Sequence, residues 1–291
     1  MKRRIEMSGD YRSRLFSSYN ATHVSHLDAD DESKLAFFRE YTRVNYLQHL
    51  VNLDGNSAEI LEIACNKGYL LAALHSLEFK KLFGIDLSPL DVEKAKQIVP
   101  SADISYADAF DYLHENVEKF DVIILKAVLE HIQKEQVIPL LDRIKSSLKP
   151  AGMVIIDVPN MDWLFAQHER YMDFTHEVGF TRESLAQVMR QVFSSVYIEK
   201  GKPVMGSGLK ARVELQLRAI LVLSLNLVFR LIGEGASDTW WDSRSIIGIA
   251  KNDNGAGHIS RKRSNVQPHQ APRIFYAIRA FRTGVSIEIY S

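Results

Sequence analysis

The fold of this chain is indicated most directly by the stretch Ile60-Leu61-Glu62-Ile63-Ala64-Cys65-Asn66-Lys67-Gly68-Tyr69-Leu70-Leu71. An apolar run ends in an acid, small residues follow, and an apolar helical pattern then begins. This order is typical of the strand, tight turn and helix that open a nucleotide-binding α/β unit. Further on, Leu82-Phe83-Gly84-Ile85-Asp86 predicts a second strand that also ends in an acid. A carboxylate there can accept hydrogen bonds from both hydroxyls of a ribose.

Strand and helix patterns alternate over most of the chain, which predicts a parallel sheet with helices on both faces. Two late strands follow this alternating region, at 195–200 and 245–251. The earlier strands are expected at 59–64, 81–86, 103–106, 120–125 and 153–158, and the helices at 68–77, 89–98, 108–115, 134–148 and 181–192.

Length and composition favour one large domain with appendages. The 291 residues include 36 basic and 36 acidic side chains, so the formal net charge is zero. A broad electrostatic surface for nucleic acid is therefore not expected, which leaves open only a local patch. The single Cys65 cannot form an internal disulfide, which fits a reducing compartment. No signal peptide and no apolar run of about 20 residues is evident, so a cytoplasmic location is expected.

The first turn resembles that of the class I S-adenosylmethionine-dependent methyltransferases, whose motif runs acid-x-Gly-x-Gly-x-Gly. Ala64 and Asn66 stand where glycines are usual, whereas Gly68 matches. Asparagine tolerates left-handed backbone better than most residues, so the turn can survive. A Rossmann-like unit that binds another nucleotide, or none, is the alternative. The resemblance implies S-adenosylmethionine as cofactor, held by Glu62, Ala64, Asn66, Gly68, Tyr69, Asp86, Leu87, Asp108, Ala109, Lys126 and Tyr46.

Three later segments resemble further motifs of the same family. Asp103–Tyr106 and the following Asp108 resemble the third-strand motif, whose acid holds the adenine amino group. The segment from Phe120 to His131 resembles the fourth-strand motif with its Leu-Glu-His ending, and Leu148–Gly152 resembles the turn before strand five. The resemblance implies an α/β, Rossmann-like, doubly wound sheet of seven mostly parallel strands. A helical insert, 203–243, would join the last two strands.

A fifth segment resembles a narrower group. Asp173-Phe174-Thr175-His176-Glu177 is similar to a signature of methyltransferases encoded in bacterial cell-surface polysaccharide clusters. This resemblance implies O-methylation of a sugar hydroxyl on a small-molecule or lipid-linked glycan acceptor. Such a hydroxyl needs a base, and His176, Asp173 and His131 are the candidates. Each also has a structural alternative: Asp173 could order its loop, His176 could be a structural hydrogen-bonding residue, and His131 could orient a helix.

Metal and nucleic-acid chemistry are not expected. Some quinone-pathway methyltransferases carry Glu-x-x-Glu-His for a divalent ion, but Ala127 replaces the first glutamate here. Enzymes that methylate base amino groups place an Asn/Asp-Pro-Pro turn after strand four, and this chain has Leu125-Lys126-Ala127-Val128 instead. Lys126 could pair with an acidic substrate or with Glu130, one turn further on.

The expected organisation is an N-terminal helical lid region at 1–58, a methyltransferase domain at 59–251 and a basic tail at 252–291. Within the insert, the segment 213–232 is apolar on nearly every side. It is therefore expected to pack in the core over the sheet edge. A homodimer interface and a membrane-surface contact are the alternatives. The tail combines basic residues 261–263 with an amphipathic pattern at 272–282. This combination fits either a peripheral membrane contact or a docked or solvated tail.

Two rival functions remain at this stage. In the first, the enzyme methylates a small lipophilic acceptor such as a quinone precursor. In the second, the chain keeps the methyltransferase fold without catalysis, as Ala64 and Asn66 would allow, and serves as an assembly partner.

Overall fold

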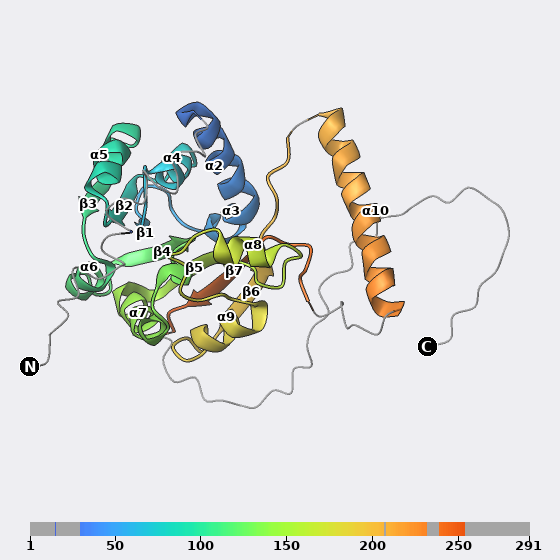
Figure 1. Ribbon diagram of the computed structural model, residues 1–291. Helices are drawn as coiled ribbons and strands as arrows, with labels where there is room; N and C mark the ends of the chain where they lie inside the picture. The colour runs from blue at the N-terminus through green and yellow to red at the C-terminus, as the bar shows by residue number, and fades with distance from the viewer. Residues whose placement is uncertain (1–14, 16–29, 207, 232–238, 254–291) are drawn as a thin grey trace, which may run out of the picture. The chain divides into compact units, whose positions relative to one another are not determined.

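The computed structural model describes residues 15, 30–206, 208–231 and 239–253 (Figure 1). Its centre is one seven-stranded sheet in the order β3-β2-β1-β4-β5-β7-β6. All pairs are parallel except those that β7 makes with β5 and β6. The predicted doubly wound, mostly parallel sheet is confirmed. The strands are β1 (Glu59–Ile63), β2 (Lys81–Asp86), β3 (Asp103–Tyr106), β4 (Phe120–Lys126), β5 (Leu148–Pro159), β6 (Val196–Lys200) and β7 (Ser245–Lys251).

Helices cover both faces of the sheet because successive strand residues point to opposite sides. Ile60, Val122 and Ile124 pack into one core cluster, while Leu61 and Ile123 pack into the other. The first cluster includes residues of α2 (Asp31–Asn45), α3 (Leu47–Leu50), α4 (Tyr69–Ser76) and α5 (Pro89–Ile98). The second includes residues of α6 (Ala109–Glu115), α7 (Lys134–Ser147) and α9 (Arg182–Met189), on the opposite side in Figure 1.

The strand order reverses direction between β1 and β4, which are neighbours in the centre of the sheet. In open α/β sheets such a reversal opens a crevice at the carboxyl ends of the strands. The first turn, Asp86, Lys126 and the end of β5 all lie at this edge.

The fifth strand begins earlier than expected. Leu148 already pairs with Phe120, and the register then shifts so that Val122 pairs with Met153. The Lys149–Gly152 segment was expected to form the turn before this strand. Instead it forms an irregularity inside the strand. Ala151 has a φ of 65° there, and its N–H donates to the carbonyl of Asn252 at 2.9 Å.

The insert forms α10 (Leu209–Leu231), and none of its residues is buried. The expectation that it packs in the core over the sheet edge is therefore wrong. Side-chain contacts tie it to the segment before β7: Arg218 donates to the carbonyl of Asp242 at 2.8 Å, and Trp241 donates to Asn226 at 3.0 Å.

The terminal segments lie mostly outside the described residues, and this includes the basic cluster at 261–263 and the helical pattern at 272–282. Within the described parts of the chain, no helix has the length and apolar character needed to cross a membrane.

Candidate functional site

The first turn, between β1 and α4, takes the conformation that glycines usually adopt. Ala64, Asn66 and Gly68 have φ angles of 55°, 47° and 80°, so every second residue is left-handed. A Cβ at Gly68 would lie 3.1 Å from the Ala95 Cβ, which leaves little room for a larger residue. The Asn66 N–H donates to Asp86 Oδ2 at 2.8 Å and thereby joins the turn to the end of β2.

Asp86 is held at the cofactor edge by backbone groups. Its Oδ1 accepts the Ser88 N–H at 2.8 Å, while Oδ2 accepts that of Asn66. Burial raises the pKa of this carboxyl, and the two N–H donors oppose that shift. Ser88 is also the N-cap of α5, so the acid and the start of the helix are positioned together.

The other residues expected at the cofactor lie as follows. Leu87 is exposed beside Asp86, and Asp108 caps α6 by accepting the Phe110 N–H at 2.8 Å, with Ala109 as the first helical residue. The Tyr69 hydroxyl donates to Asp31 at 2.5 Å. Glu62 is buried, burial raises its pKa, and its Oε2 has no hydrogen-bond partner among the described residues. Direct contact of these residues with the cofactor stays a prediction.

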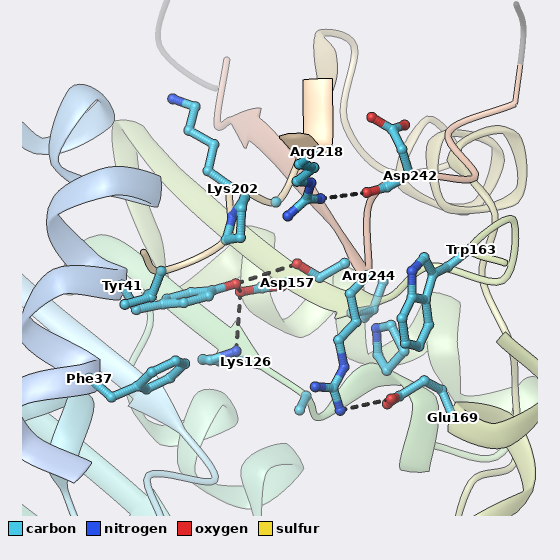
Figure 2. Close-up of a pocket in the computed structure, with 17 residues that line it drawn as sticks. Phe37, Tyr41, Lys126, Asp157, Trp163, Glu169, Lys202, Arg218, Asp242 and Arg244 are labelled. Carbon is cyan, nitrogen blue, oxygen red and sulfur yellow. Dashed lines mark hydrogen bonds and ion pairs between the residues drawn. The ribbon is translucent and has the colours of Figure 1, made fainter. Parts of the chain in front are cut away.

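A cavity of about 600 Å³ lies over the carboxyl ends of β4 and β5 (Figure 2). Lys126 is the only predicted site residue in its lining. Sequence reasoning missed the others that matter for its chemistry, which are aromatic, acidic or basic side chains from separate parts of the chain: Phe37, Tyr41, Asp157, Trp163, Glu169, Lys202, Arg218, Asp242 and Arg244.

Asp157 organises the floor of this cavity. It is only 2% exposed, and its Oδ2 accepts the hydroxyls of Tyr41 and Tyr46 at 2.6 Å each. Burial, and then the charge of Asp157, raise the pKa of both tyrosines, so their hydroxyls remain donors at neutral pH. Tyr46 was expected at the cofactor, but it is fully buried and its hydroxyl serves Asp157.

Lys126 completes this cluster. Its Nζ lies 3.4 Å from Asp157 Oδ2 and 4.3 Å from the centre of the Tyr41 ring. The two charged residues are partners in the β4–β5 register, which explains why they meet. The partners considered from the sequence were an acidic substrate and Glu130, whereas the structure pairs Lys126 with Asp157. One signal could have revealed Asp157, because it ends an apolar run just as Asp86 does.

Three further cations line the cavity, together with the acids Glu169 and Asp242. Arg244 pairs with Glu169 at 2.7 Å, and Arg218 binds the Asp242 carbonyl rather than a carboxylate. Within the described chain, the Lys202 ammonium group donates to the neutral Gln48 side chain at 3.4 Å. Phe37 and Tyr41 lie on one side in Figure 2, and Trp163 lies on the other.

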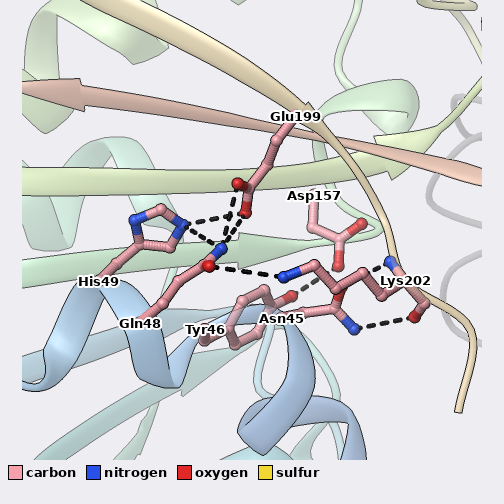
Figure 3. Close-up of polar contacts among 7 residues, drawn as sticks. All are labelled: Asn45, Tyr46, Gln48, His49, Asp157, Glu199 and Lys202. Atoms are coloured by element: carbon pink, nitrogen blue, oxygen red, sulfur yellow. Dashed lines mark hydrogen bonds and ion pairs between the residues drawn. The ribbon is translucent and has the colours of Figure 1, made fainter. Parts of the chain in front are cut away.

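Side chains of α2 and α3 bind the end of β6 and the segment after it, which includes Lys202 (Figure 3). Asn45 exchanges hydrogen bonds with both backbone groups of Lys202, at 3.1 and 2.7 Å. Gln48 and His49 reach Glu199 of β6 at 2.8 and 2.9 Å. The N-terminal helices therefore fix the chain leaving β6 and shape the cavity from that side.

The three predicted bases gather near one another but outside the cavity lining. His131 belongs to the short 3-10 helix η2 (Leu129–His131), and Asp173 and His176 follow α8 (Ala166–Tyr171). The imidazole rings lie 4.7 Å apart between centroids. Asp173 accepts both the N–H and the hydroxyl of Thr175, at 2.8 and 2.7 Å. These contacts favour an ordering role for Asp173, and a catalytic role for the three residues stays a prediction.

Comparison with known proteins gives the family. Residues 37–192, more than half of the chain, match the model of the methyltransferase domain family. The chain belongs to this family. It is a methyltransferase enzyme, as expected, and the expectation of S-adenosylmethionine as its cofactor is confirmed, whereas the alternative of a non-catalytic assembly partner is wrong.

Solved structures support the fold. A SAM-dependent methyltransferase from Archaeoglobus fulgidus is similar with a TM-score of 0.54 and 21% identity, over 73% of this chain and 94% of that one. Phosphoethanolamine N-methyltransferase 2 of Haemonchus contortus, in complex with S-adenosylmethionine, is similar with a TM-score of 0.55 and 15% identity. This match covers 84% of the methyltransferase described here and 60% of the other chain.

The curated relatives correct the predicted acceptor. Proteins named tRNA U34 carboxymethyltransferase, from Campylobacter hominis and Nautilia profundicola, are 29% and 28% identical over 128 and 124 residues. The matches cover 43% and 41% of this chain. They span 44% and 40% of the length of the two relatives, which is less than half of each. This finding overturns the expected sugar or glycan acceptor, with its quinone alternative, and the exclusion of nucleic acid. The exclusion relied on net charge and on the missing Asn/Asp-Pro-Pro turn. Net charge averages over the molecule and misses local basic surfaces, and the turn is typical only of enzymes that methylate base amino groups.

Proposed function

We propose that this methyltransferase transfers the methyl group of S-adenosylmethionine to a nucleotide of an RNA that enters the cavity over β4 and β5. One observation carries the proposal: the cavity brings aromatic side chains together with two cations that have no acidic partner among the described residues. Lys202 and Arg218 line it, and neither forms an ion pair with an acidic side chain within the described residues.

The two kinds of side chain suit the two parts of a nucleotide. Phe37, Tyr41 and Trp163 offer aromatic faces on which an unpaired base can stack. Lys202 and Arg218 offer donors for the phosphates on either side of the base. The cavity volume of about 600 Å³ lies within the usual range for ligand sites, roughly 300–1,000 Å³.

The surface beside the cavity is also locally basic. Helix α10 carries Lys210, Arg212, Arg218 and Arg230 against one acid, Glu214, and none of its residues is buried. A neutral chain can therefore still present a basic element to an RNA backbone. The names of the curated relatives, which refer to tRNA, support the same class of acceptor.

For the transfer itself, we assign the donor to the turn at 64–68 and to Asp86, at the carboxyl edge of β1 and β2. In-line transfer requires the acceptor atom to face the methyl group, and the enzyme's main task is to hold that alignment. An acceptor that loses a proton needs a base. Asp157 lies in the cavity itself, whereas His176, Asp173 and His131 lie outside its lining.

The test is incorporation of label from radioactive S-adenosylmethionine into tRNA transcribed in vitro, which carries no modifications. We expect label in a nucleoside after digestion. Lys202→Ala and Arg218→Ala should each raise the KM for RNA by about tenfold, because each removes a charge-assisted phosphate contact, while leaving the affinity for the donor unchanged.

Lys96→Ala is the matched control, since Lys96 pairs with Glu93 at 3.1 Å on α5 and is not part of the cavity. Its KM should equal that of the unaltered enzyme. Failure to label RNA under conditions in which the protein binds the donor would refute the proposal. Equal KM values for the Lys202, Arg218 and Lys96 variants would also refute it.

A further inference from the structure

Three side chains that can ligate a metal converge beside the cavity. Glu130 and His131 end η2, immediately after β4, and His176 comes from the loop that follows α8. One ligand atom from each of the three lies within 4.8 Å of the others. Backbone contacts hold the two segments together, because the N–H groups of Glu177 and Val178 donate to the Glu130 carbonyl at 2.8 and 3.1 Å.

The Glu130 carboxyl group has no hydrogen-bond partner in the described parts of the chain. The residue is 3% exposed, and both of its carboxyl oxygens are buried and unpartnered. Buried polar atoms are nearly always paired, so such a group requires an explanation. The neighbouring Asp173, 4% exposed, shows the usual arrangement, since it accepts two hydrogen bonds from Thr175.

The hydrogen bonds of the two imidazoles fix which nitrogen carries the lone pair. The Thr175 hydroxyl donates to Asp173, so it accepts from His131 Nδ1 at 2.8 Å. His176 Nδ1 lies 2.9 Å from the carbonyl oxygen of Glu169, which can only accept. In the neutral form of each ring, these contacts place the lone pair on Nε2. Histidine ligands of metals typically donate their other N–H to such acceptors.

We propose that Glu130, His131 and His176 bind a divalent transition-metal ion, with Zn²⁺ as the best match. Two imidazoles and one carboxylate form a ligand set known from zinc sites that keep an open position, whereas Mg²⁺ and Ca²⁺ prefer oxygen ligands. Bonds of about 2.0–2.2 Å require the three side chains to close slightly around the ion. No metal was expected because Ala127 replaces the first glutamate of the Glu-x-x-Glu-His motif. That glutamate is not needed in the proposed site, because His176 supplies the third ligand.

The test is a titration of the full-length, tag-free protein with Co²⁺ after dialysis against a chelator, followed by visible absorption. We expect one ion per chain, displaced by Zn²⁺. His176→Ala and Glu130→Gln should each weaken binding by at least about tenfold, and His168→Ala, an exposed histidine on α8, should not change it. This readout is independent of methyl transfer, so the site and the proposed RNA acceptor can fail separately.

Thr175→Val extends the test if a ligand variant does not fold. It removes the acceptor of the His131 Nδ1–H and should weaken Co²⁺ binding by about tenfold without removing a ligand. Absence of stoichiometric Co²⁺ binding by the unaltered protein would overturn the proposal. So would equal weakening by His168→Ala, which would indicate binding to surface histidines.

Discussion

At the scale of single residues, Ala64 shows how the first turn forms without its usual glycines. Its φ of 55° lies in the left-handed region, where a Cβ costs about 1–2 kcal/mol. Ala64→Gly removes that strain but gives the unfolded chain more freedom, which costs about 0.5–1 kcal/mol. We expect a net stabilisation of about 0.5–1 kcal/mol, measured as a higher urea midpoint with an unchanged slope.

Ala72→Gly is the control for this change because Ala72 has helical backbone inside α4. It should lower the free energy of unfolding by about 1 kcal/mol, since glycine is a poor helix former. A lower midpoint for Ala64→Gly as well would show that the turn carries no strain at this position.

Asp86 gives the residue-scale prediction for the cofactor. Asp86→Ala removes the proposed acceptor of the ribose hydroxyls and two backbone contacts that hold the turn. The affinity for S-adenosylmethionine should fall at least about tenfold in a calorimetric titration. Asp103→Ala, at the exposed start of β3, should bind normally. Unchanged affinity in the Asp86 variant would contradict the assignment.

The raised pKa of Asp86 adds a pH dependence to donor binding. Only the ionised carboxyl accepts both ribose hydroxyls, so affinity should be lost as the pH falls through the raised pKa. The loss should therefore begin at a higher pH than for an ordinary aspartate.

At the scale of elements, α2 and α3 are joined to the sheet through Asp157. Tyr46→Phe keeps the ring and removes one of the two tyrosine hydroxyls that Asp157 Oδ2 accepts. A hydrogen bond to a charged group contributes about 1.5–3 kcal/mol, so the free energy of unfolding should fall by that amount. Denaturant unfolding measures it. Tyr106→Phe, an exposed tyrosine in β3, should change nothing, and an equal effect in both variants would contradict the role of Asp157.

Most elements could be predicted because apolar runs bounded by turn residues identify strands directly. The start of β5 could not be predicted. Proline and glycine, here Pro150 and Gly152, are typical of a turn between elements, and they do not distinguish such a turn from a bulge within a strand. The exposure of α10 was missed for another reason: a pattern shows that a segment is apolar but not where it lies in the fold.

Sequence reasoning located those residues of the candidate site whose position depends only on the strand that they end. Asp86 and Lys126 end β2 and β4, so their position at the carboxyl edge follows from the pattern. The Tyr41–Asp157 contact joins residues 116 positions apart, and the Glu130–His176 proximity joins η2 to the loop after α8. Such contacts depend on packing between distant elements, which periodicity in one sequence does not encode.

At the scale of the whole molecule, charge placement matters more than net charge. The 36 basic and 36 acidic residues cancel, yet α10 carries four basic residues against one acid. Within the described residues, Lys202 and Arg218 at the cavity also form no ion pair with an acidic side chain. If RNA binds there, its affinity must fall with salt because bound phosphates release counterions. The slope of log affinity against log salt concentration then counts the phosphate contacts.

The double variant Lys202→Ala/Arg218→Ala tests this count. For the unpaired nucleotides proposed to bind at the cavity, each phosphate contact contributes about 0.7 to the slope, so the magnitude of the slope should fall by about 1.4 relative to the unaltered protein. Fluorescence anisotropy with labelled tRNA at several salt concentrations measures it. Lys96→Ala should leave the slope unchanged, because that lysine already pairs with Glu93. A double variant with the original slope would mean that neither cation meets a phosphate, and the RNA path would have to avoid both.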